Sequence, residues 1–255
     1  MYVQLLGPIR LVDDEGVSVR VPGEKLRVIL ASLALSPKTP VAAVDLLDEL
    51  WGARPPRTAE NSLQSHIARL RRILAEETGR PEARDIIRTA GPGYMLAIDP
   101  DDVDAFRFTR AVDLSAQYVR SDPSRITGVL DHALAMWRGP ALLDAGHGII
   151  CRTAYARLEE ARLIAREMVV EAYLRLGMHQ RVIPDLKQLL SQHPLRERFC
   201  EQLMIALYRA GCQADAISTY HRIRRHLSAE LGLEPGPGMQ NTLREILCQE
   251  EGASL

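Results

Sequence analysis

The chain has 255 residues, enough for two domains, and its formal net charge of −1 at pH 7 excludes a protein that binds nucleic acid through bulk positive charge. Hydrophobic residues make up 46% of the chain and aromatic residues only 5%, so each core must consist mainly of Leu, Ile, Val and Ala. No window approaches the roughly 18 apolar residues of a membrane span, and residues 1–6 do not have the pattern of a signal peptide. We therefore expect a cytoplasmic protein without a membrane segment.

Short β-rich runs begin the chain and two helices follow them. The runs cover residues 2–6, 9–12 and 17–21, and turn residues separate them. Apolar residues at helical spacing then predict helices over 25–35 and 40–51, the first stopping near a proline and the second at a glycine. This part of the sequence predicts a small antiparallel sheet and two helices.

The third predicted helix, residues 58–74, has two chemically different faces. One face is an apolar stripe formed by Leu63, Ile67, Leu70 and Leu74. The opposite face carries small, hydrogen-bonding or cationic side chains, namely Thr58, Asn61, Ser65, Ala68 and Arg72, flanked by Gln64 and Arg69. Asn and Gln can pair with adenine, Arg with guanine, and Ser or Thr with a base or a phosphate. This face is therefore suited to the major groove of DNA.

A β-hairpin is predicted directly after this helix and a short polar connector. Residues 86–88 and 95–98 are β-like and flank a turn of Gly91, Pro92 and Gly93. The order of strands, three helices and a hairpin indicates a winged helix-turn-helix, in which the third helix enters the major groove. An ordinary solvated helix beside a hairpin is the alternative that this segment leaves open.

From residue 105 onward the sequence predicts helices almost without interruption. Residues 99–104 contain a proline and four aspartates, so they end the wing and can cap the helix that follows. The predicted helices span residues 103–119, 125–137, 150–176, 179–192, 195–210, 213–231 and 237–249.

A repeat is visible within this helical half. Residues 172–177 (AYLRLG) and 206–211 (ALYRAG) are displaced by 34 residues, which is the tetratricopeptide period. Such helix pairs bury their apolar faces against their neighbours and form stacks that bind proteins. A helical scaffold or dimerisation module without a separate ligand remains the alternative.

The common catalytic and metal-binding motifs do not occur in this sequence. It has no phosphate-binding loop, dinucleotide fingerprint, nucleophile elbow or zinc-protease motif. The cysteines at 151, 200, 212 and 248 have no zinc spacing and are expected to be buried, reduced thiols. His147 and Cys151 are four residues apart, but no third ligand is near them. We expect no catalytic residue, no metal and no cofactor.

Two segments carry a resemblance to a known family. ENSLQSHIARLRRIL followed by IIRTAGPGYMLAI resembles the DNA-binding domain of OmpR-type response regulators. PLRERFCEQLMIALYRAGCQADAISTYHRIRRHLSAELGLEPGPGMQNTLREIL is similar to the bacterial transcriptional activation domain. Together they resemble, over nearly the whole chain, the Streptomyces antibiotic regulatory protein (SARP) family. Cys212 stands where the family usually has Arg, a departure that does not touch the proposed DNA face.

The expected fold is mainly α with a small β component. It comprises an N-terminal winged helix-turn-helix over residues 1–98, a linker over 99–104, and a tetratricopeptide-like, all-α activation domain over 105–255. The resemblance implies a sequence-specific activator of secondary-metabolite (antibiotic) genes that acts at the nucleoid. It also implies that protomers bind promoter direct repeats side by side as a dimer, and that they recruit RNA polymerase holoenzyme through its sigma factor and other subunits.

Candidate DNA contacts follow from the helix face and the resemblance together. Those on the recognition helix are Arg57, Thr58, Asn61, Ser62, Gln64, Ser65, Arg69, Arg71 and Arg72. We expect base contacts from Asn61, Gln64, Ser65 and Arg69. Those on the wing or toward the DNA backbone are Lys25, Arg88, Thr89 and Tyr94. The resemblance implies that the loop over residues 52–56 contacts polymerase, which makes Trp51 and Arg54 candidates.

Two other functions remain open at this point. A repressor or architectural protein would use the same groove chemistry with a different effect on transcription. A helical-repeat adaptor with a vestigial first domain would not bind DNA sequence-specifically.

Overall fold

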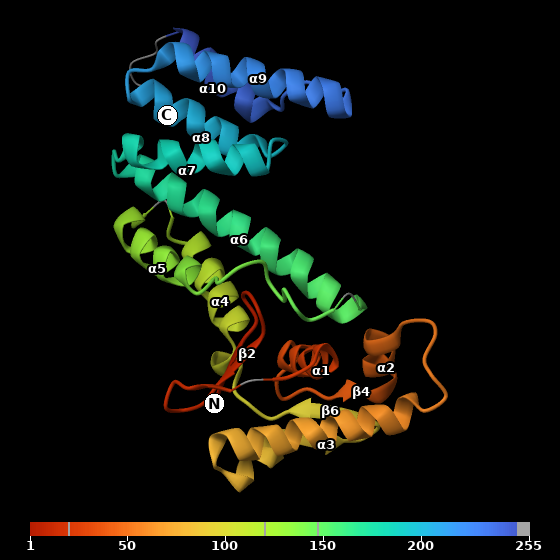
Figure 1. The fold of residues 1–255 in the computed structure, drawn as a ribbon. Helices are drawn as coiled ribbons and strands as arrows, with labels where there is room; N and C mark the ends of the chain where they lie inside the picture. Colours follow the sequence, from red (N-terminus) through yellow and green to blue (C-terminus); the bar gives the residue numbers. More distant parts are fainter. Residues whose placement is uncertain (20, 120, 147, 249–255) are drawn as a thin grey trace. The chain divides into compact units, whose positions relative to one another are not determined.

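The computed structural model describes residues 1–19, 21–119, 121–146 and 148–248 and is mainly helical, with two small sheets (Figure 1). The chain forms two compact units. The first comprises Met1–Leu114 and His132–Leu163, and the second comprises Ser115–Asp131 and the chain from Ile164 onward. His147 and the end of the last predicted helix, at residue 249, lie outside the described residues.

The first sheet consists of β1 (Tyr2–Gln4), β2 (Arg10–Val12) and β3 (Ser18–Val19), all antiparallel and in that order. Val3, Leu11 and Val19 are paired across the sheet and are at most 3% exposed, so one face of the sheet contributes to the core. The strands are shorter than the predicted β runs, because the chain after β1 turns away and bonds to a different segment.

Three helices follow this sheet along the chain, as the sequence predicts. They are α1 (Glu24–Ala34), α2 (Ala43–Trp51) and α3 (Ala59–Thr78). The second helix begins later than expected because β4 (Val41–Ala42) pairs with the wing. The third continues beyond its expected end to Thr78, and Gly79, with a φ of 63°, terminates it in the left-handed conformation.

The wing is a hairpin of β5 (Ile87–Ala90) and β6 (Gly93–Leu96), which a 3-10 helix, η1 (Pro81–Ile86), connects to α3. Strand β6 lies between β4 and β5, so the second sheet ties the wing to the start of α2. The short polar connector between helix and wing is therefore a 3-10 helix over Pro81–Ile86.

The segment between β1 and β2 bonds to a loop far away in the sequence, within the same compact unit. The backbone N–H groups of Arg138 and Leu142 donate to the carbonyl oxygens of Leu6 and Leu5, each at 2.8 Å. The N–H of Ile9 donates to Asp144 Oδ1 at 2.7 Å. The first sheet is thus held by residues from both halves of the sequence.

The Asp104 carboxyl group is buried next to the segment between β1 and β2. A short 3-10 helix, η2 (Pro100–Asp102), leads into α4 (Asp104–Ala116). The Asp104 side chain is 1% exposed and accepts the N–H of Leu5 at 2.6 Å and that of Leu6 at 3.2 Å, with the Arg138 guanidinium 3.7 Å away. Burial raises the pKa of Asp104, although these hydrogen bonds and the Arg138 charge oppose the shift.

A second carboxylate, on α2, caps the long helix α6 (Ile149–Arg175). Glu49 accepts the N–H of Ile150 at 2.7 Å and that of Cys151 at 3.0 Å. Two backbone N–H groups that have no partner within α6 therefore donate to a side chain of the helix-turn-helix. A Cβ on Gly148 would overlap the Glu49 carboxylate, so this approach requires glycine.

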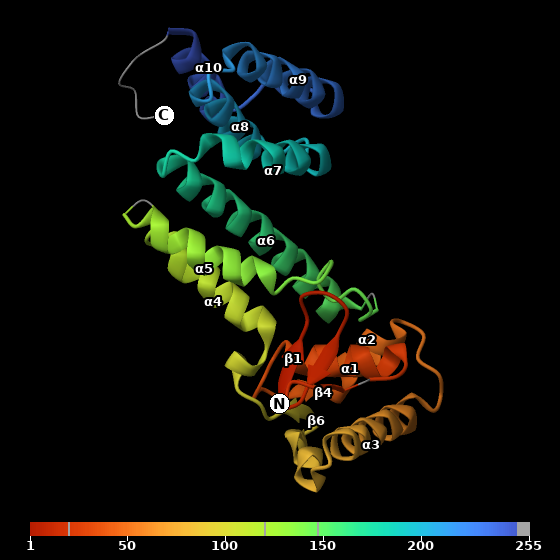
Figure 2. The same ribbon diagram turned by 60° about the vertical axis from the view of Figure 1, so that its left-hand side comes forward.

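The remaining helices follow the predicted order closely. They are α5 (Pro123–Ala135), α7 (His179–Gln192), α8 (Glu197–Arg209), α9 (Gln213–Leu231) and α10 (Pro237–Cys248). Within the second unit α8 packs against α7, α9 and α10 (Figures 1 and 2). This is the stacked arrangement that the repeat predicts.

The expectation that all four cysteines are buried is wrong for Cys212 and Cys248. All four thiols are free, and Cys151 and Cys200 are buried, but Cys212 precedes α9 and Cys248 ends α10, where both face solvent. Burial raises the pKa of Cys200 to about 12, so this thiol stays protonated at neutral pH.

No helix among the described residues is both long and apolar enough to span a bilayer. The described residues also contain no cluster of three or more His, Cys, Asp or Glu side chains suited to a metal ion.

Replacing Asp104 should destabilise the chain strongly. We expect Asp104→Ala to lower the free energy of unfolding by about 3 kcal/mol, because it leaves two buried N–H groups without their acceptor and removes the opposite charge 3.7 Å from the half-buried Arg138 guanidinium. Asp113→Ala, at an exposed position on the same helix, should change it by less than about 0.5 kcal/mol. Urea unfolding followed by circular dichroism measures both, and equal effects would contradict a special role for Asp104.

Candidate nucleic-acid interface

Helix α3 is anchored by its apolar stripe. Leu63, Ile67, Leu70 and Leu74 are 0–2% exposed, as the helical spacing predicts. The candidate residues in and before this helix that are exposed are Arg57, Thr58, Asn61, Gln64, Ser65, Arg69 and Arg72. The polar face is therefore open to solvent over the first three turns of the helix.

The start of α3 differs slightly from the prediction. The helix begins at Ala59, so Thr58 is its N-cap residue and Arg57 lies in the preceding turn. The Thr58 side chain makes no capping hydrogen bond. The Ser65 hydroxyl donates to the carbonyl oxygen of Asn61 at 2.8 Å, which leaves its lone pairs as acceptors. Ser62 is half-buried and less accessible than its neighbours.

Arg71 connects α3 to the wing. Its Nε donates to the Ile87 carbonyl oxygen at 2.8 Å, and its Nη2 donates to Thr89 Oγ1 at 3.0 Å. The structure therefore brings Arg71 and Thr89 together and engages both in positioning the hairpin. Arg72, one position further along, is 62% exposed and lies 3.9 Å from Glu76, a separation at which a surface pair contributes little.

A basic hollow lies where α3 meets the wing. It has a volume of about 560 Å³, and three arginines line it, Arg71, Arg84 and Arg88, together with Thr89 and one acidic residue, Asp85. Arg88 Nε donates to the Asp85 carbonyl oxygen at 3.1 Å, and both Arg84 and Arg88 are exposed. Arg84 was not among the predicted contacts, because its segment carried no periodic signal in the sequence. Tyr94, the remaining wing candidate, is half-buried and is paired with Val41.

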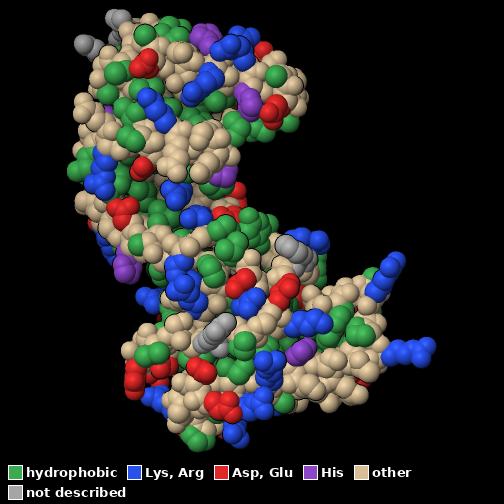
Figure 3. Space-filling view, viewed as in Figure 1, with side chains coloured by type: hydrophobic (Ala, Val, Ile, Leu, Met, Phe, Trp, Pro, Cys, Tyr) green, Lys and Arg blue, Asp and Glu red, His purple; other side chains and the backbone are tan. Residues whose placement is uncertain are grey.

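Three side chains from three helices stack beside the N-terminal half of α3. Lys25 Nζ lies 4.2 Å from the centre of the Trp51 ring, and the rings of Trp51 and His66 are stacked with centroids 6.5 Å apart. Burial lowers the pKa of His66, and the positive charges of Lys25 and Arg69 lower it further. The structure thus engages Lys25 and Trp51 with each other, whereas Arg54 is exposed in the α2–α3 loop. Basic side chains project at this end of the surface (Figure 3).

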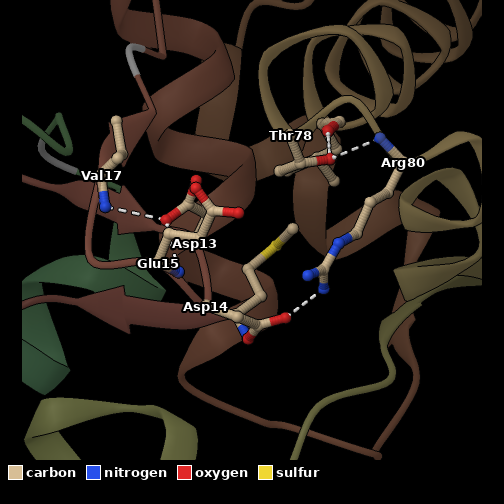
Figure 4. Close-up of polar contacts among 8 residues, drawn as sticks. Asp13, Asp14, Glu15, Val17, Thr78 and Arg80 are labelled. Atoms are coloured by element: carbon tan, nitrogen blue, oxygen red, sulfur yellow. Dashed lines mark hydrogen bonds and ion pairs between the residues drawn. The ribbon is translucent and has the colours of Figure 1, made fainter.

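The C-terminal end of α3 is fixed against the β2–β3 turn (Figure 4). Arg80 forms an ion pair with Asp14. Asp13 accepts the N–H groups of Glu15 at 2.9 Å and Val17 at 2.8 Å, which shapes the turn. Arg80 thus links the segment after α3 to the β2–β3 turn, while burial of the apolar stripe anchors the helix itself.

Comparisons with known proteins agree with this architecture. The family described as "Bacterial transcriptional activator domain" matches residues 103–247, and that described as "Transcriptional regulatory protein, C terminal" matches residues 22–96. The transcriptional regulator RedD of Streptomyces coelicolor is 43% identical over 97% of this chain and 71% of its own length. The regulatory protein DnrI of Streptomyces peucetius is 35% identical over 99% of this chain and 94% of its own.

The chain belongs to the SARP family of transcriptional activators. A solved structure of Mycobacterium tuberculosis EmbR in complex with a low affinity phosphopeptide matches this SARP protein with a TM-score of 0.90 at 32% identity. The match covers 97% of this chain and 65% of the EmbR chain, so part of EmbR has no counterpart in the match. Both matched families are families of transcriptional regulators.

The two glycines of the wing turn have different roles in this SARP protein. A Cβ at Gly93 would overlap the Val41 carbonyl oxygen, where β6 pairs with β4. Gly91 has a φ of 55° and no atom near the position of a Cβ. We expect Gly93→Ala to lower the free energy of unfolding by about 2–3 kcal/mol because it separates the strands. Gly91→Ala should cost about 1 kcal/mol, from the left-handed backbone alone. Thermal unfolding measures both, and the reverse order would refute the strand contact.

Proposed function

We propose that this SARP protein is a sequence-specific, DNA-binding activator of secondary-metabolite genes. The supporting observation is the orientation of α3: its apolar stripe is at most 2% exposed, and its amide and guanidinium groups face solvent. A helix of this kind, carried beside a hairpin, fits the major groove while the hairpin follows the neighbouring backbone.

Contacts to bases are assigned to the exposed face of the first turns of α3. Asn61 and Gln64 can each donate to and accept from adenine, and Arg69 can donate twice to guanine. Ser65 can accept from a base because its own hydroxyl proton is engaged with the backbone. Ser62 and Thr58 lie beside this set and would adjust its position on the duplex.

Contacts to phosphates are assigned to the arginines around this face. Arg57 and Arg72 flank it, and Arg84 and Arg88 line the hollow beside the wing. Arg71 acts through the wing, which it fixes by its bonds to Ile87 and Thr89. Lys25, which also contacts Trp51, and the half-buried Tyr94 are the remaining candidates for contacts to the DNA backbone. These charges give affinity that falls steeply with salt, whatever the net charge of the chain.

We assign DNA binding to residues 1–98, the connection to 99–104 and activation to 105–255. Protomers bind direct repeats side by side, and DNA-bound protein recruits RNA polymerase holoenzyme through its sigma factor. Arg54 is exposed in the α2–α3 loop and is the better candidate for a polymerase contact, since Trp51 is half-buried between Lys25 and His66. The place of action is then the nucleoid in the cytoplasm.

Substitutions on α3 separate base contacts from phosphate contacts. On a duplex selected by the protein from a random library, Asn61→Ala and Arg69→Ala should each reduce discrimination against altered bases by about 1–3 kcal/mol. Arg72→Ala should weaken binding to all sequences alike and reduce the log–log salt slope by about 0.9. Fluorescence anisotropy across a salt series gives both quantities. Arg244→Ala, at an exposed position of α10, is the control. If the wild-type protein showed no sequence preference, this would exclude the proposal in favour of an adaptor.

Transcription in vitro tests activation separately from binding. With the selected duplex placed upstream of a weak promoter, the protein should increase the transcript made by purified holoenzyme. Arg54→Ala should keep the DNA affinity of the wild type and lose most of this increase, because it removes a contact made only with polymerase. An unchanged or reduced transcript from promoter DNA that the protein occupies would instead identify a repressor or an architectural protein.

A further inference from the structure

A hollow of about 480 Å³ lies between α7 and α9 in the second unit. Helix α8 packs against both of these helices. The inner part of the hollow is apolar: Leu190 and Ile223 are only 3% and 4% exposed, and the more accessible Pro194 and Ala229 extend the apolar lining outward. A side chain entering the hollow would therefore meet a hydrophobic surface.

The rim of the hollow is basic. Lys187 on α7 and Arg222 and Arg225 on α9 are exposed and line it together with His226, and none of its described lining residues is acidic. Lys and Arg side chains gather with histidines on the part of the surface that α9 forms (Figure 3). Concentrated charge of one sign around a concave surface attracts a ligand of the opposite sign.

Among the described residues, no carboxylate forms an ion pair with Lys187, Arg222 or Arg225, whereas the His226 imidazole lies 3.2 Å from Glu230. Arg225 donates only to a backbone carbonyl oxygen, that of His221, at 3.4 Å. The adjacent Arg224 points to a different partner and forms two bonds with Glu234, at 2.6 and 3.1 Å. The positive charges on the rim of the hollow are therefore available to a ligand. Elsewhere on the helices of this unit, ion pairs are common.

We propose that this hollow binds an acidic peptide segment of a partner protein. Carboxylates of the segment pair with Lys187, Arg222 and Arg225, and an apolar side chain between them packs on Leu190 and Ile223. The apolar floor favours a peptide over nucleic acid, because a phosphate backbone has no hydrophobic group to cover it. The site does not use α3 or the wing, so it is independent of the DNA-binding proposal.

A labelled peptide tests this site directly on the full chain. The probe is a short fluorescein-labelled peptide in which Asp and Glu alternate with Leu, and its control has Lys in place of every acid. Anisotropy should show saturable binding of the acidic peptide only, weakened by added salt. Failure of the acidic peptide to bind, or equal binding of the basic peptide, would overturn the proposal.

Three variants locate the binding. The double variant Arg222→Glu, Arg225→Glu should weaken binding of the acidic peptide by about tenfold or more, because it places negative charges opposite the carboxylates of the peptide. Ala229→Trp should also weaken it, by filling the hollow without a change of charge. Arg244→Glu, an exposed site on α10, is the matched charge control and should leave binding unchanged.

Two measurements make these variants decisive. Circular dichroism melting confirms that each variant is folded, and Arg222→Gln replaces the double variant if the latter is not. Equal weakening by Arg244→Glu, or full affinity in Ala229→Trp, would show attraction to general charge and not to the hollow. Displacement of the peptide by an equal concentration of duplex DNA of unrelated sequence would identify a nucleic-acid surface and reject the peptide site.

Discussion

Burial of the apolar stripe on α3 is the constraint on which the proposed DNA interface depends. A helix has one rotational setting that hides Leu63, Ile67, Leu70 and Leu74 together, and this setting turns Asn61 outward. The exposed polar groups therefore need no partners inside the protein. These groups face outward because burial of the apolar side chains on the opposite side of the same helix is favourable.

Most of the fold could be predicted from the sequence because its signals are local. The stripe of α3 and the wing turn each depend on residues close to one another in the chain, and the period of 34 residues can be read by comparing two segments of the sequence directly. The short strand β4 could not be predicted in this way. Val41 and Ala42 read as the start of a helix, and they are extended only because β6, about fifty residues later, pairs with them.

The polar surface of the interface was predictable in composition but not in pairing. The periodicity identifies the exposed face of α3, yet nothing in it distinguishes Arg71, which fixes the wing, from Arg72, which is 62% exposed. The stack of Lys25, Trp51 and His66 joins three helices and has no signature along the chain. Arg84 was missed because an irregular connector has no period from which a face can be read.

The capping of α6 by Glu49 limits how such regulators can be recombined. The carboxylate belongs to a helix of the helix-turn-helix, whereas the amides that it binds and the glycine that makes room for it belong to the other half of the sequence. A chimaera that takes its DNA-reading half from one relative and its helical half from another must inherit positions 49 and 148 as a compatible pair. To exchange target specificity within the family, residue 49 and residue 148 must therefore be transferred together, although they lie in different halves of the sequence.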